Sequence, residues 1–410
     1  MKLLQVDTLE SAREKLMTAC SGLEPESELV SLDLAEGRIL AQDIISGENI
    51  PGFYRSSVDG YAVCSKDTAG ATESIPVFLK IVEEVSIGHP AKKAIRSGEC
   101  TYVPTGGMVP EGADAMVMVE YCELFDATEV AVYASVPFGA SVVTPGEDVK
   151  KGQLLLKKGT RIGPAQCGVL AAAGVVEVPV FKPWKVSILS TGDELVDPSQ
   201  VPGSGQVRDI NTWALSAFAG KSGMQVVLKR TLADEEALLE EAVREAAGTS
   251  DLVLTSGGSS QGKKDMTSEI LDRVSGGGVF THGLALKPGK PTILGFDKGG
   301  QTLLAGLPGH PVAALTVFEL LLVWLWRQKT GQPEELLTTA RMKTNLASAP
   351  GKTTCLLVRL RRESDGYAAE PILGKSGLIS TMTEADGYVL VDMNQEGLQA
   401  GDTVLVHRFG

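Results

Sequence analysis

Positive charge, paired cysteines and long apolar runs are all scarce in this chain of 410 residues. Its 38 lysines and arginines are outnumbered by 51 aspartates and glutamates, so the formal net charge is -13. An acidic chain lacks the broad basic surface that binds a phosphate backbone, which excludes nucleic acid as a default partner. A phosphorylated small molecule would have to meet positive charge that is concentrated locally.

The cysteines and most histidines form no metal-binding pattern. The six cysteines are scattered without a CxxC pair, so they indicate neither a zinc site nor a disulfide framework and fit reduced thiols in a cytosol. His89, His282 and His407 are isolated in the sequence and have no metal-ligand spacing.

The sequence also shows no apolar run that predicts a membrane-spanning segment. The N-terminal sequence MKLLQVDTLESAREK has no apolar stretch long enough for a signal peptide. The most apolar run, Leu315–Trp326, is interrupted by Glu319 and is too short to span a bilayer, so it predicts a buried helix. We therefore expect a cytoplasmic protein with no membrane partner.

Changes in the apolar pattern divide the chain into successive segments. After a helical start that Thr8 caps, short strand-like runs between residues 58 and 143 predict a small β domain. From Lys185 onward, strands and helices alternate, which predicts a doubly wound parallel sheet with ligands at the carboxyl ends of its strands. The final segment shows strand patterns that predict a small all-β C-terminal domain, at residues 354–361, 388–392 and 403–407.

A loop rich in glycine and serine, Thr255–Gly262, follows a buried strand and precedes a predicted helix at residues 265–274. Glycines there let backbone N–H groups approach an anion, and the helix N-terminus adds a favourable dipole. Lys263 and Lys264 add local positive charge. The loop matches neither GxGxxG nor a Walker loop, so a flexible βα loop is the alternative to phosphate binding.

Two proline-rich turns are further candidates. Leu286–Pro291 carries two lysines on a stiff backbone, which suits an oxyanion or a diphosphate, although an ordinary charged turn is the alternative. Gly306–Pro311 connects a strand to the long apolar helix, with Pro311 in a first helical turn. It is either a tight connection or a close backbone approach to a ligand, and His310 is more often a packing or capping residue than a catalyst.

Acidic side chains occur at several predicted turns, namely Asp59, Asp148, Asp193, Glu194, Asp234 and Asp265. Acids beside a phosphate loop can hold Mg²⁺, which takes one or two carboxylates together with phosphate oxygens. Asp234 and Asp265 also suit the N-caps of the helices that follow them, a use that needs no function. Both interpretations remain open from the residues alone.

Taken in order, these segments resemble the molybdopterin molybdenumtransferase family, which includes the C-terminal domain of gephyrin. The ordered set covers nearly the whole chain and is far more specific than any single motif. Its members are Arg55–Ala62, Pro104–Gly106, Pro110–Ala115, Gly146–Asp148, Ser190–Leu195, Asp209–Asn211, Thr255–Gly258, Lys287–Pro291 and Gly306–Gly309.

The resemblance implies an elongated homodimer with four domains in each chain. An N-terminal helical and linker domain comprises residues 1–46 and 145–182, and a β domain of residues 47–144 is inserted into it. An α/β domain like those of pterin-adenylylating enzymes follows at residues 183–331. A C-terminal β-barrel-like domain comprises residues 332–410. The fold class expected is thus a multidomain combination of α/β and β. The active site would lie between the α/β domain and the β domains, partly from the partner subunit.

The resemblance also implies a reaction. The family hydrolyses adenylylated molybdopterin, releases AMP and places molybdate on the dithiolene, with Mg²⁺ assisting. A molybdopterin adenylyltransferase is a further candidate partner. Catalytic residues implied by the motifs are Asp59, Thr105, Asp148, Glu194, Asp234 and Asp265, with Asp234 and Asp265 as Mg²⁺ ligands. Substrate-binding residues implied are Thr191, Gly192, Asp193, Ser256, Gly257, Gly258, Ser259, Lys287, Lys290, Pro308, Pro311 and Ser376.

Some positions depart from the family pattern. Ser259–Gly262 replaces a usual Val-Ser-Val-Gly, Ala313 replaces a serine, and Gly283 stands where a lysine is often found. Leu357 falls where an arginine is common, and we expect Arg359, on the same strand face, to take its place. These losses keep open a diverged paralogue that binds molybdopterin or acts as a scaffold without catalysis. An enzyme specific for tungstate is a further alternative, because molybdate and tungstate have nearly equal size and charge.

Overall fold

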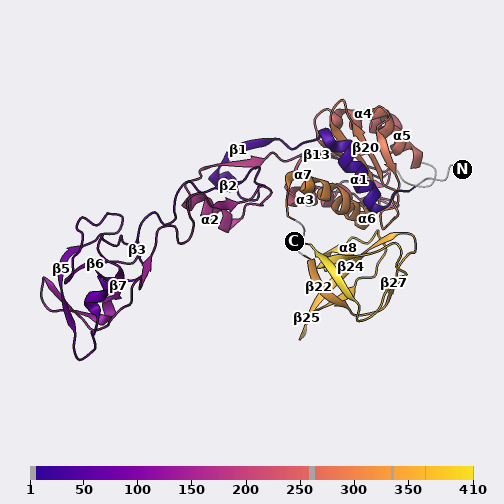
Figure 1. Cartoon of the computed structure of the whole chain (residues 1–410). Coiled ribbons are helices and arrows are strands. Elements are labelled where there is room, and N and C mark those ends of the chain that lie inside the picture. Colours follow the sequence, from indigo (N-terminus) through magenta and orange to yellow (C-terminus); the bar gives the residue numbers. More distant parts are fainter. Residues whose placement is uncertain (1–5, 258–263, 334–336, 365, 410) are drawn as a thin grey trace.

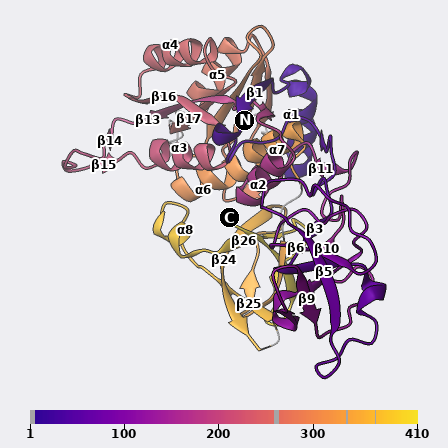
Figure 2. The same ribbon diagram turned by 90° about the vertical axis from the view of Figure 1, so that its left-hand side faces the viewer.

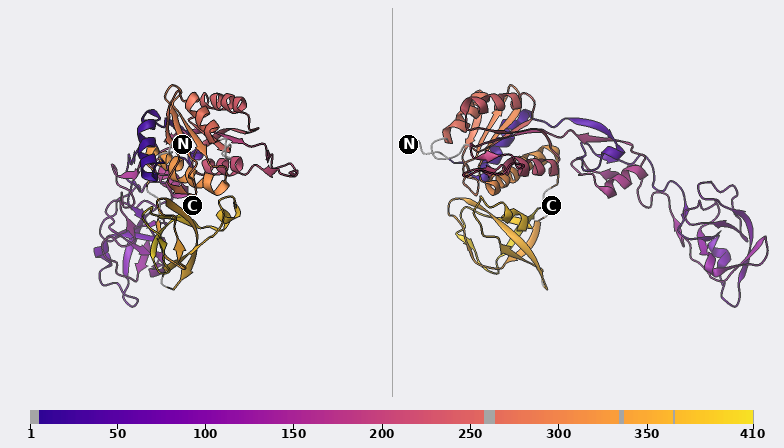
Figure 3. Two further views of the ribbon diagram at one scale, coloured as in Figure 1. Left: turned by 90° about the vertical axis from the view of Figure 1, so that its right-hand side faces the viewer. Right: turned by 180° about the vertical axis from the view of Figure 1, so that it is seen from behind.

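The computed structural model describes residues 6–257, 264–333, 337–364 and 366–409, and the molecule is elongated (Figure 1). A distal β unit lies at one end and a small central unit follows it. An α/β unit and a C-terminal barrel lie side by side at the other end (Figure 2). Seen from behind, the distal unit again stands well apart from the α/β unit (Figure 3).

The distal unit is a mixed sheet with the strand order β7-β4-β6-β5-β9-β8. Its apolar side chains, including Val63, Leu79 and Val117, form a separate buried cluster. The strands are β4 Gly60–Val63, β5 Val77–Glu84, β6 Glu99–Val103, β7 Ala115–Met118, β8 Cys122–Leu124 and β9 Glu129–Val132. Two short strands, β3 Arg55–Ser56 and β10 Val142–Val143, pair where the chain enters and leaves this unit.

The central unit is built from two antiparallel pairs and one helix. β1 Ser27–Ser31 pairs with β12 Glu177–Phe181, and β2 Ile44–Ile45 pairs with β11 Leu154–Leu156. The helix α2, Pro164–Ala172, buries Leu170 in the same cluster as strand residues. The chain passes through this unit twice, so the distal unit is an insertion.

The α/β unit contains a six-stranded sheet with the order β16-β13-β17-β21-β20-β18. The first four strands are parallel, and the last two run antiparallel to their neighbours. The expected doubly wound sheet is confirmed, with an antiparallel edge that the pattern did not predict. The strands are β13 Lys185–Thr191, β16 Gln225–Leu232, β17 Leu252–Gly257, β18 Val279–His282, β20 Ile293–Asp297 and β21 Thr302–Leu307.

Alternating side chains of the buried strands supply a core on each face of this sheet. Leu252 and Leu254 point to one core, while Val253 joins the other. The first core is covered by α1 Leu9–Ala19, α3 Asn211–Lys221, α6 Pro311–Val317 and α7 Trp324–Thr330. The second core is covered by α4 Glu236–Ala247 and α5 Lys264–Val274. A small parallel pair, β14 Leu195–Val196 and β15 Val207–Arg208, extends from the unit (Figure 2).

The first helix does not pack where its place in the chain suggested. Thr8 caps α1 as expected, because its hydroxyl oxygen accepts the Ser11 N–H at 3.1 Å. Leu9 and Leu16 are then buried in the α/β core, and Arg13 donates two hydrogen bonds to the Leu320 carbonyl. Residues 1–46 were expected to belong with the central unit, but the apolar face of α1 is buried against the α/β unit.

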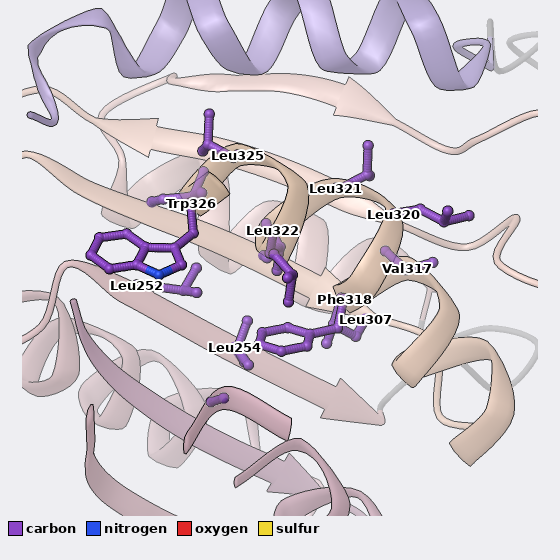
Figure 4. Packing of buried hydrophobic residues seen from close by; sticks show 14 of the residues in the cluster. Leu252, Leu254, Leu307, Val317, Phe318, Leu320, Leu321, Leu322, Leu325 and Trp326 are labelled. Atoms are coloured by element: carbon purple, nitrogen blue, oxygen red, sulfur yellow. The ribbon is translucent and has the colours of Figure 1, made fainter. Parts of the chain in front are cut away.

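The long apolar run is a buried helix, as predicted. Residues 311–330 continue from α6 through a π-helical segment, Phe318–Val323, into α7. Its length and composition also suit a membrane span, but 83% of its most apolar window is buried inside the fold. Figure 4 shows Phe318 and Trp326 packed over the strand residues Leu252 and Leu254.

The C-terminal unit is a closed barrel. Its sheet runs β24-β25-β22-β28-β26, and β26 pairs again with β24. The strands are β22 Leu337–Met342, β24 Thr353–Glu363, β25 Gly366–Pro371, β26 Gly387–Val391 and β28 Thr403–Arg408, accompanied by the pair β23 Leu346–Ala347 and β27 Gly397–Leu398 and by α8 Ser380–Glu384. One strand of the α/β unit, β19 Leu286–Lys287, pairs in parallel with β24. This pairing joins the barrel to the turn that carries Lys287 and Lys290.

Candidate functional site

A cavity of about 1100 Å³ lies between the α/β unit and the barrel. From the α/β unit it is lined by the ends of β13 and β17, the turn after β19 and the start of α6. From the barrel it is lined by β23, β24 and the loop that precedes α8. Of the residues expected to act, it brings together Thr191, Glu194, Asp234, Gly257, Lys287, Lys290, Pro308 and Ser376.

Two adjacent parallel strands end at the cavity. Thr191 ends β13 and stands in register with Gly257 at the end of β17, which is where open α/β sheets bind ligands. Gly257 has a φ of +109°, and a Cβ there would collide with the Thr191 carbonyl oxygen. The Thr191 hydroxyl is buried and has no hydrogen-bond partner within the described residues. A buried hydroxyl of this kind is suited to a ligand.

The lysine turn has a backbone that only glycine permits. Gly289 has a φ of +134°, and a Cβ there would lie 2.8 Å from both Leu286 Cδ2 and Val317 Cγ2. The turn is therefore packed tightly against the core while its two lysines remain exposed. Because both lysines line the cavity, the turn presents two ammonium groups to one ligand.

A hydrogen-bond network holds the strand ends behind the cavity. The Asn211 side-chain amide donates to Ser256 Oγ at 2.6 Å and to the Gly309 carbonyl at 2.9 Å. Asp209 accepts from the hydroxyls of Thr212 at 2.6 Å and Thr231 at 2.8 Å. Ser256 is thus buried in a supporting network and does not line the cavity, unlike the expected direct role in substrate binding.

The two acids on the cavity wall come from different loops. Glu194 follows β13, and Asp234 follows β16. The Asp234 N–H donates to Asp193 Oδ1 at 3.0 Å, so Asp193 shapes the loop that presents Asp234. Asp193 and Gly192 line a neighbouring hollow instead of the cavity. Because α4 begins at Glu236 with Glu235 as its N-cap, the capping interpretation of Asp234 is wrong.

Three expected catalytic residues lie far from this cavity in the same chain. Asp59 and Thr105 belong to the distal unit, where Asp59 Oδ1 accepts the Thr105 N–H at 2.7 Å. Asp148 lies on the segment that returns from that unit. All three are exposed, and the distal unit that carries Asp59 and Thr105 lies at the end of the molecule opposite the barrel (Figure 3). One chain alone therefore does not assemble the full set of expected residues.

The remaining expected residues have mixed outcomes. Pro311 is buried at the first turn of α6, beside the cavity wall but not on it. Gly258, Ser259 and the side chain of Asp265 lie outside the described residues. Arg359 does not replace the missing arginine: its Nη2 lies 2.8 Å from Glu384 Oε2, and only Leu357 of the two lines the cavity. That expectation is wrong because α8 places an acid beside Arg359.

Apart from Ser376, the sequence pattern missed the residues that the barrel contributes to the cavity. Lys352 and Lys375 line the cavity together with Lys287 and Lys290, so four lysines face two carboxylates there. His310 Nδ1 lies 2.8 Å from Ser376 Oγ, which ties the start of α6 to the barrel. No motif marks these lysines, since they become neighbours of the α/β loops only when the barrel docks.

The donor set suits Mg²⁺ when phosphate is bound. Among the described residues no three acids, histidines or cysteines gather into a metal-binding cluster. Mg²⁺ does not need one, because it is held by one or two carboxylates together with substrate phosphates and waters. Asp234 and Glu194 supply carboxylates on the wall of a cavity that also carries lysines for an anion.

Comparison with known proteins accounts for the whole arrangement. Residues 7–174 match the MoeA N-terminal region (domain I and II), residues 187–328 a probable molybdopterin binding domain, and residues 339–409 the MoeA C-terminal region (domain IV). The molybdopterin molybdenumtransferase of Haemophilus influenzae is 32% identical over 98% of both chains. The chain belongs to the molybdopterin molybdenumtransferase family.

Other family members agree along the full length. The molybdopterin molybdenumtransferase of Bacillus subtilis is 30% identical over 93% of this chain and 89% of its own. The crystal structure of the molybdopterin biosynthesis moea protein from Pyrococcus horikosii has a TM-score of 0.81, with 36% identity, and covers 99% of this chain and 100% of its own. The multidomain fold of the family, with the barrel that closes the cavity, is therefore shared by this chain.

Proposed function

We propose that this chain is a molybdopterin molybdenumtransferase that releases AMP from adenylylated molybdopterin and inserts molybdate, with the pterin held in the cavity between the α/β unit and the barrel. Family membership places the chain in molybdenum cofactor biosynthesis. The observation that carries the proposal is the cavity itself, where an acidic protein gathers four lysines, two from the turn after β19 and two from the barrel, beside the carboxyl ends of the parallel strands β13 and β17.

The residues on the cavity wall divide into two roles. Lys287 and Lys290 bind the negatively charged phosphates, and Gly257 on the same cavity wall leaves its backbone open to them because it has no side chain. Cleavage is an attack of water oxygen on phosphorus: the bond between the two phosphates breaks, AMP leaves, and the pterin keeps its own phosphate. In this proposal Glu194, on the cavity wall, orients the water and accepts its proton.

Magnesium fits the same site. Asp234 would hold the ion, with Asp265 as the further ligand that the family motif implies. When bound, the ion supplies Lewis-acid polarisation of the phosphate oxygens and stabilises the leaving group's charge.

We further propose that a homodimer completes the site. Asp59 and Thr105 are exposed on the distal unit, Asp148 is exposed on the segment that returns from it, and none of the three lines the cavity of its own chain (Figure 1). A twofold arrangement would let the distal unit of one subunit reach the cavity of the other. The six free cysteines fit the cytoplasm as the compartment, and a molybdopterin adenylyltransferase is the source of the substrate that we propose.

The test is incubation of the full chain with adenylylated molybdopterin, Mg²⁺ and either molybdate or tungstate, scoring AMP release and metal incorporation separately. We expect both activities with molybdate. Both oxyanions are tested because they have nearly equal size and charge. Incorporation of tungstate but not molybdate would instead establish a tungstate enzyme. Tight pterin binding without AMP release would contradict the proposal and establish a scaffold protein. The acids on the cavity wall favour the enzyme.

A further inference from the structure

The barrel contributes positive charge that the family motifs of the α/β unit do not include. Lys352 precedes β24, and Lys375 lies in the loop before α8. Both line the cavity opposite the turn that carries Lys287 and Lys290. None of these four lysines has an ion pair within the described residues, so their charge is available to a ligand.

Each of the two barrel lysines is adjacent to a residue that bonds across the joint between the units. Next to Lys352, the Thr353 N–H donates to the Ala285 carbonyl at 2.9 Å. Next to Lys375, the Ser376 carbonyl accepts the Val312 N–H at 3.1 Å. These bonds fix the backbone that carries both lysines relative to the α/β unit.

The other candidate positions on this wall carry no charge. Ala313 and Leu357 line the cavity, and both are buried. Arg359 pairs with Glu384 and does not line the cavity. Gly283 is buried beside the Lys290 backbone and does not line the cavity either. The barrel side of the cavity therefore has only Lys352 and Lys375 as cations among the described residues.

We propose that Lys352 and Lys375 are the barrel's ligands for the oxyanion, in place of the arginine that Leu357 replaces. An anion held between them and the lysines of the α/β turn neutralises charge contributed by both units. Its binding consequently stabilises the docking of the barrel as well as the anion. This inference rests on the proposed function, because it assigns the molybdate subsite of the same cavity.

The experiment measures binding of radiolabelled molybdate to the full chain by equilibrium dialysis at several salt concentrations. The variants are Lys352→Gln, Lys375→Gln and the double substitution, with Lys375→Arg to keep the charge. Arg362→Gln is the matched control, since Arg362 is exposed on β24 outside the cavity and its loss changes net charge equally. Circular dichroism checks that every variant is folded.

We expect the double variant to bind molybdate about tenfold more weakly or worse, with a smaller salt dependence, because two charge-assisted contacts are lost. Lys375→Arg and Arg362→Gln should bind like the wild type. The inference is overturned if the double variant binds like the wild type, if Arg362→Gln weakens binding equally, or if the wild-type chain binds no molybdate. Failure of the proposed function has a different signature, which is absence of AMP release by the wild type.

Discussion

At the scale of single residues, the site depends on a few positions where backbone and charge leave little choice. Gly257 and Gly289 have left-handed φ angles and no room for a side chain, and each lies where a strand or turn meets the cavity. Lys287 and Lys290, on either side of Gly289, concentrate positive charge in a chain whose formal net charge is -13. Two predictions concern these positions.

Gly257→Ala should destabilise the protein by about 1–3 kcal/mol, because the added Cβ meets the Thr191 carbonyl and the φ of +109° disfavours alanine. The measurement is the midpoint of thermal unfolding. Gly248→Ala is the control, since Gly248 ends α4 with a φ of -72° and a Cβ there makes only ordinary contacts. Equal effects of the two substitutions would contradict the assigned close approach.

Lys287→Gln and Lys290→Gln should each weaken binding of molybdopterin by about 1.5–3 kcal/mol, because a charged hydrogen-bond donor to phosphate is lost. Isothermal titration at low and moderate salt measures the change. Lys298→Gln serves as the control, because Lys298 is exposed on the same unit but lies outside the cavity. Unchanged affinity in both cavity variants would rule out their role.

The sequence identified these α/β residues but not the barrel lysines. Strand ends of a parallel sheet converge by topology, so a pattern of strand, glycine loop and lysine turn is enough to expect a shared site. Lys352 and Lys375 join that site only through the docking of a separate unit, and no local pattern encodes that docking. Arg359 was expected to replace the arginine missing at Leu357, because strand alternation does not reveal the neighbouring Glu384.

At the scale of elements, the long helix of residues 311–330 carries a buried carboxylate, Glu319. Its π-helical segment places Glu319 inside the joint between the α/β unit and the barrel, where the residue is only 7% exposed. One carboxylate oxygen lies 3.1 Å from Arg327 Nη1, and Oε2 has no hydrogen bond to any described residue. Burial raises the pKa of Glu319, although Arg327 opposes the shift.

This raised pKa predicts how stability changes with pH. The folded chain holds the Glu319 proton more tightly than the unfolded chain, whose pKa is close to 4.5. As pH rises from about 4.5 through the raised folded-state pKa, the unfolded chain binds fewer protons than the folded one. The free energy of unfolding should therefore fall over that range.

Urea denaturation of the wild type and Glu319→Gln across this pH range measures the effect. The glutamine variant should lack this component of the slope, so its stability should improve relative to the wild type as pH rises. Glu384→Gln is a control, because Glu384 forms an exposed ion pair on the barrel. Parallel pH curves for wild type and Glu319→Gln would contradict the assignment.

Most elements were predictable because their signals are local. Helices such as 211–221 and strands such as 354–361 follow from periodicity and from turn residues at their ends. The docking of α1 on the α/β sheet was not predictable, since Leu9 and Leu16 suit any apolar face. Closure of the barrel through β24 and β26 likewise depends on a pairing between distant segments.

At the scale of the whole molecule, the elongated shape separates two groups of expected catalytic residues. The α/β unit and barrel hold Glu194 and Asp234, while Asp59 and Thr105 lie at the opposite end (Figure 3). Motif order along the chain gives no such distances, because it does not say which domains of which subunit meet. The proposed homodimer resolves the separation.

Mixing two inactive variants tests that arrangement. Asp59→Asn and Asp234→Asn should each abolish AMP release, because every dimer then lacks one group in both sites. Unfolding and refolding the two together should restore about a quarter of wild-type activity, since random pairing makes about half of the dimers mixed and each of these has one intact site. Size-exclusion chromatography checks that dimers form.

The outcome decides between shared and separate sites. No recovery in a mixture that forms dimers would place both acids in the same chain's site, and an Asp59→Asn variant that is active by itself would leave Asp59 without a role. Refolding each variant with itself is the control, and it should give no activity.

The most direct test of the proposed binding site is a crystal structure of the Asp234→Asn variant with adenylylated molybdopterin bound. We predict that the ligand occupies the cavity between the α/β unit and the barrel, with its phosphates at Gly257, Lys287 and Lys290. A ligand bound outside this cavity, with its phosphates remote from those lysines, would contradict the central claim.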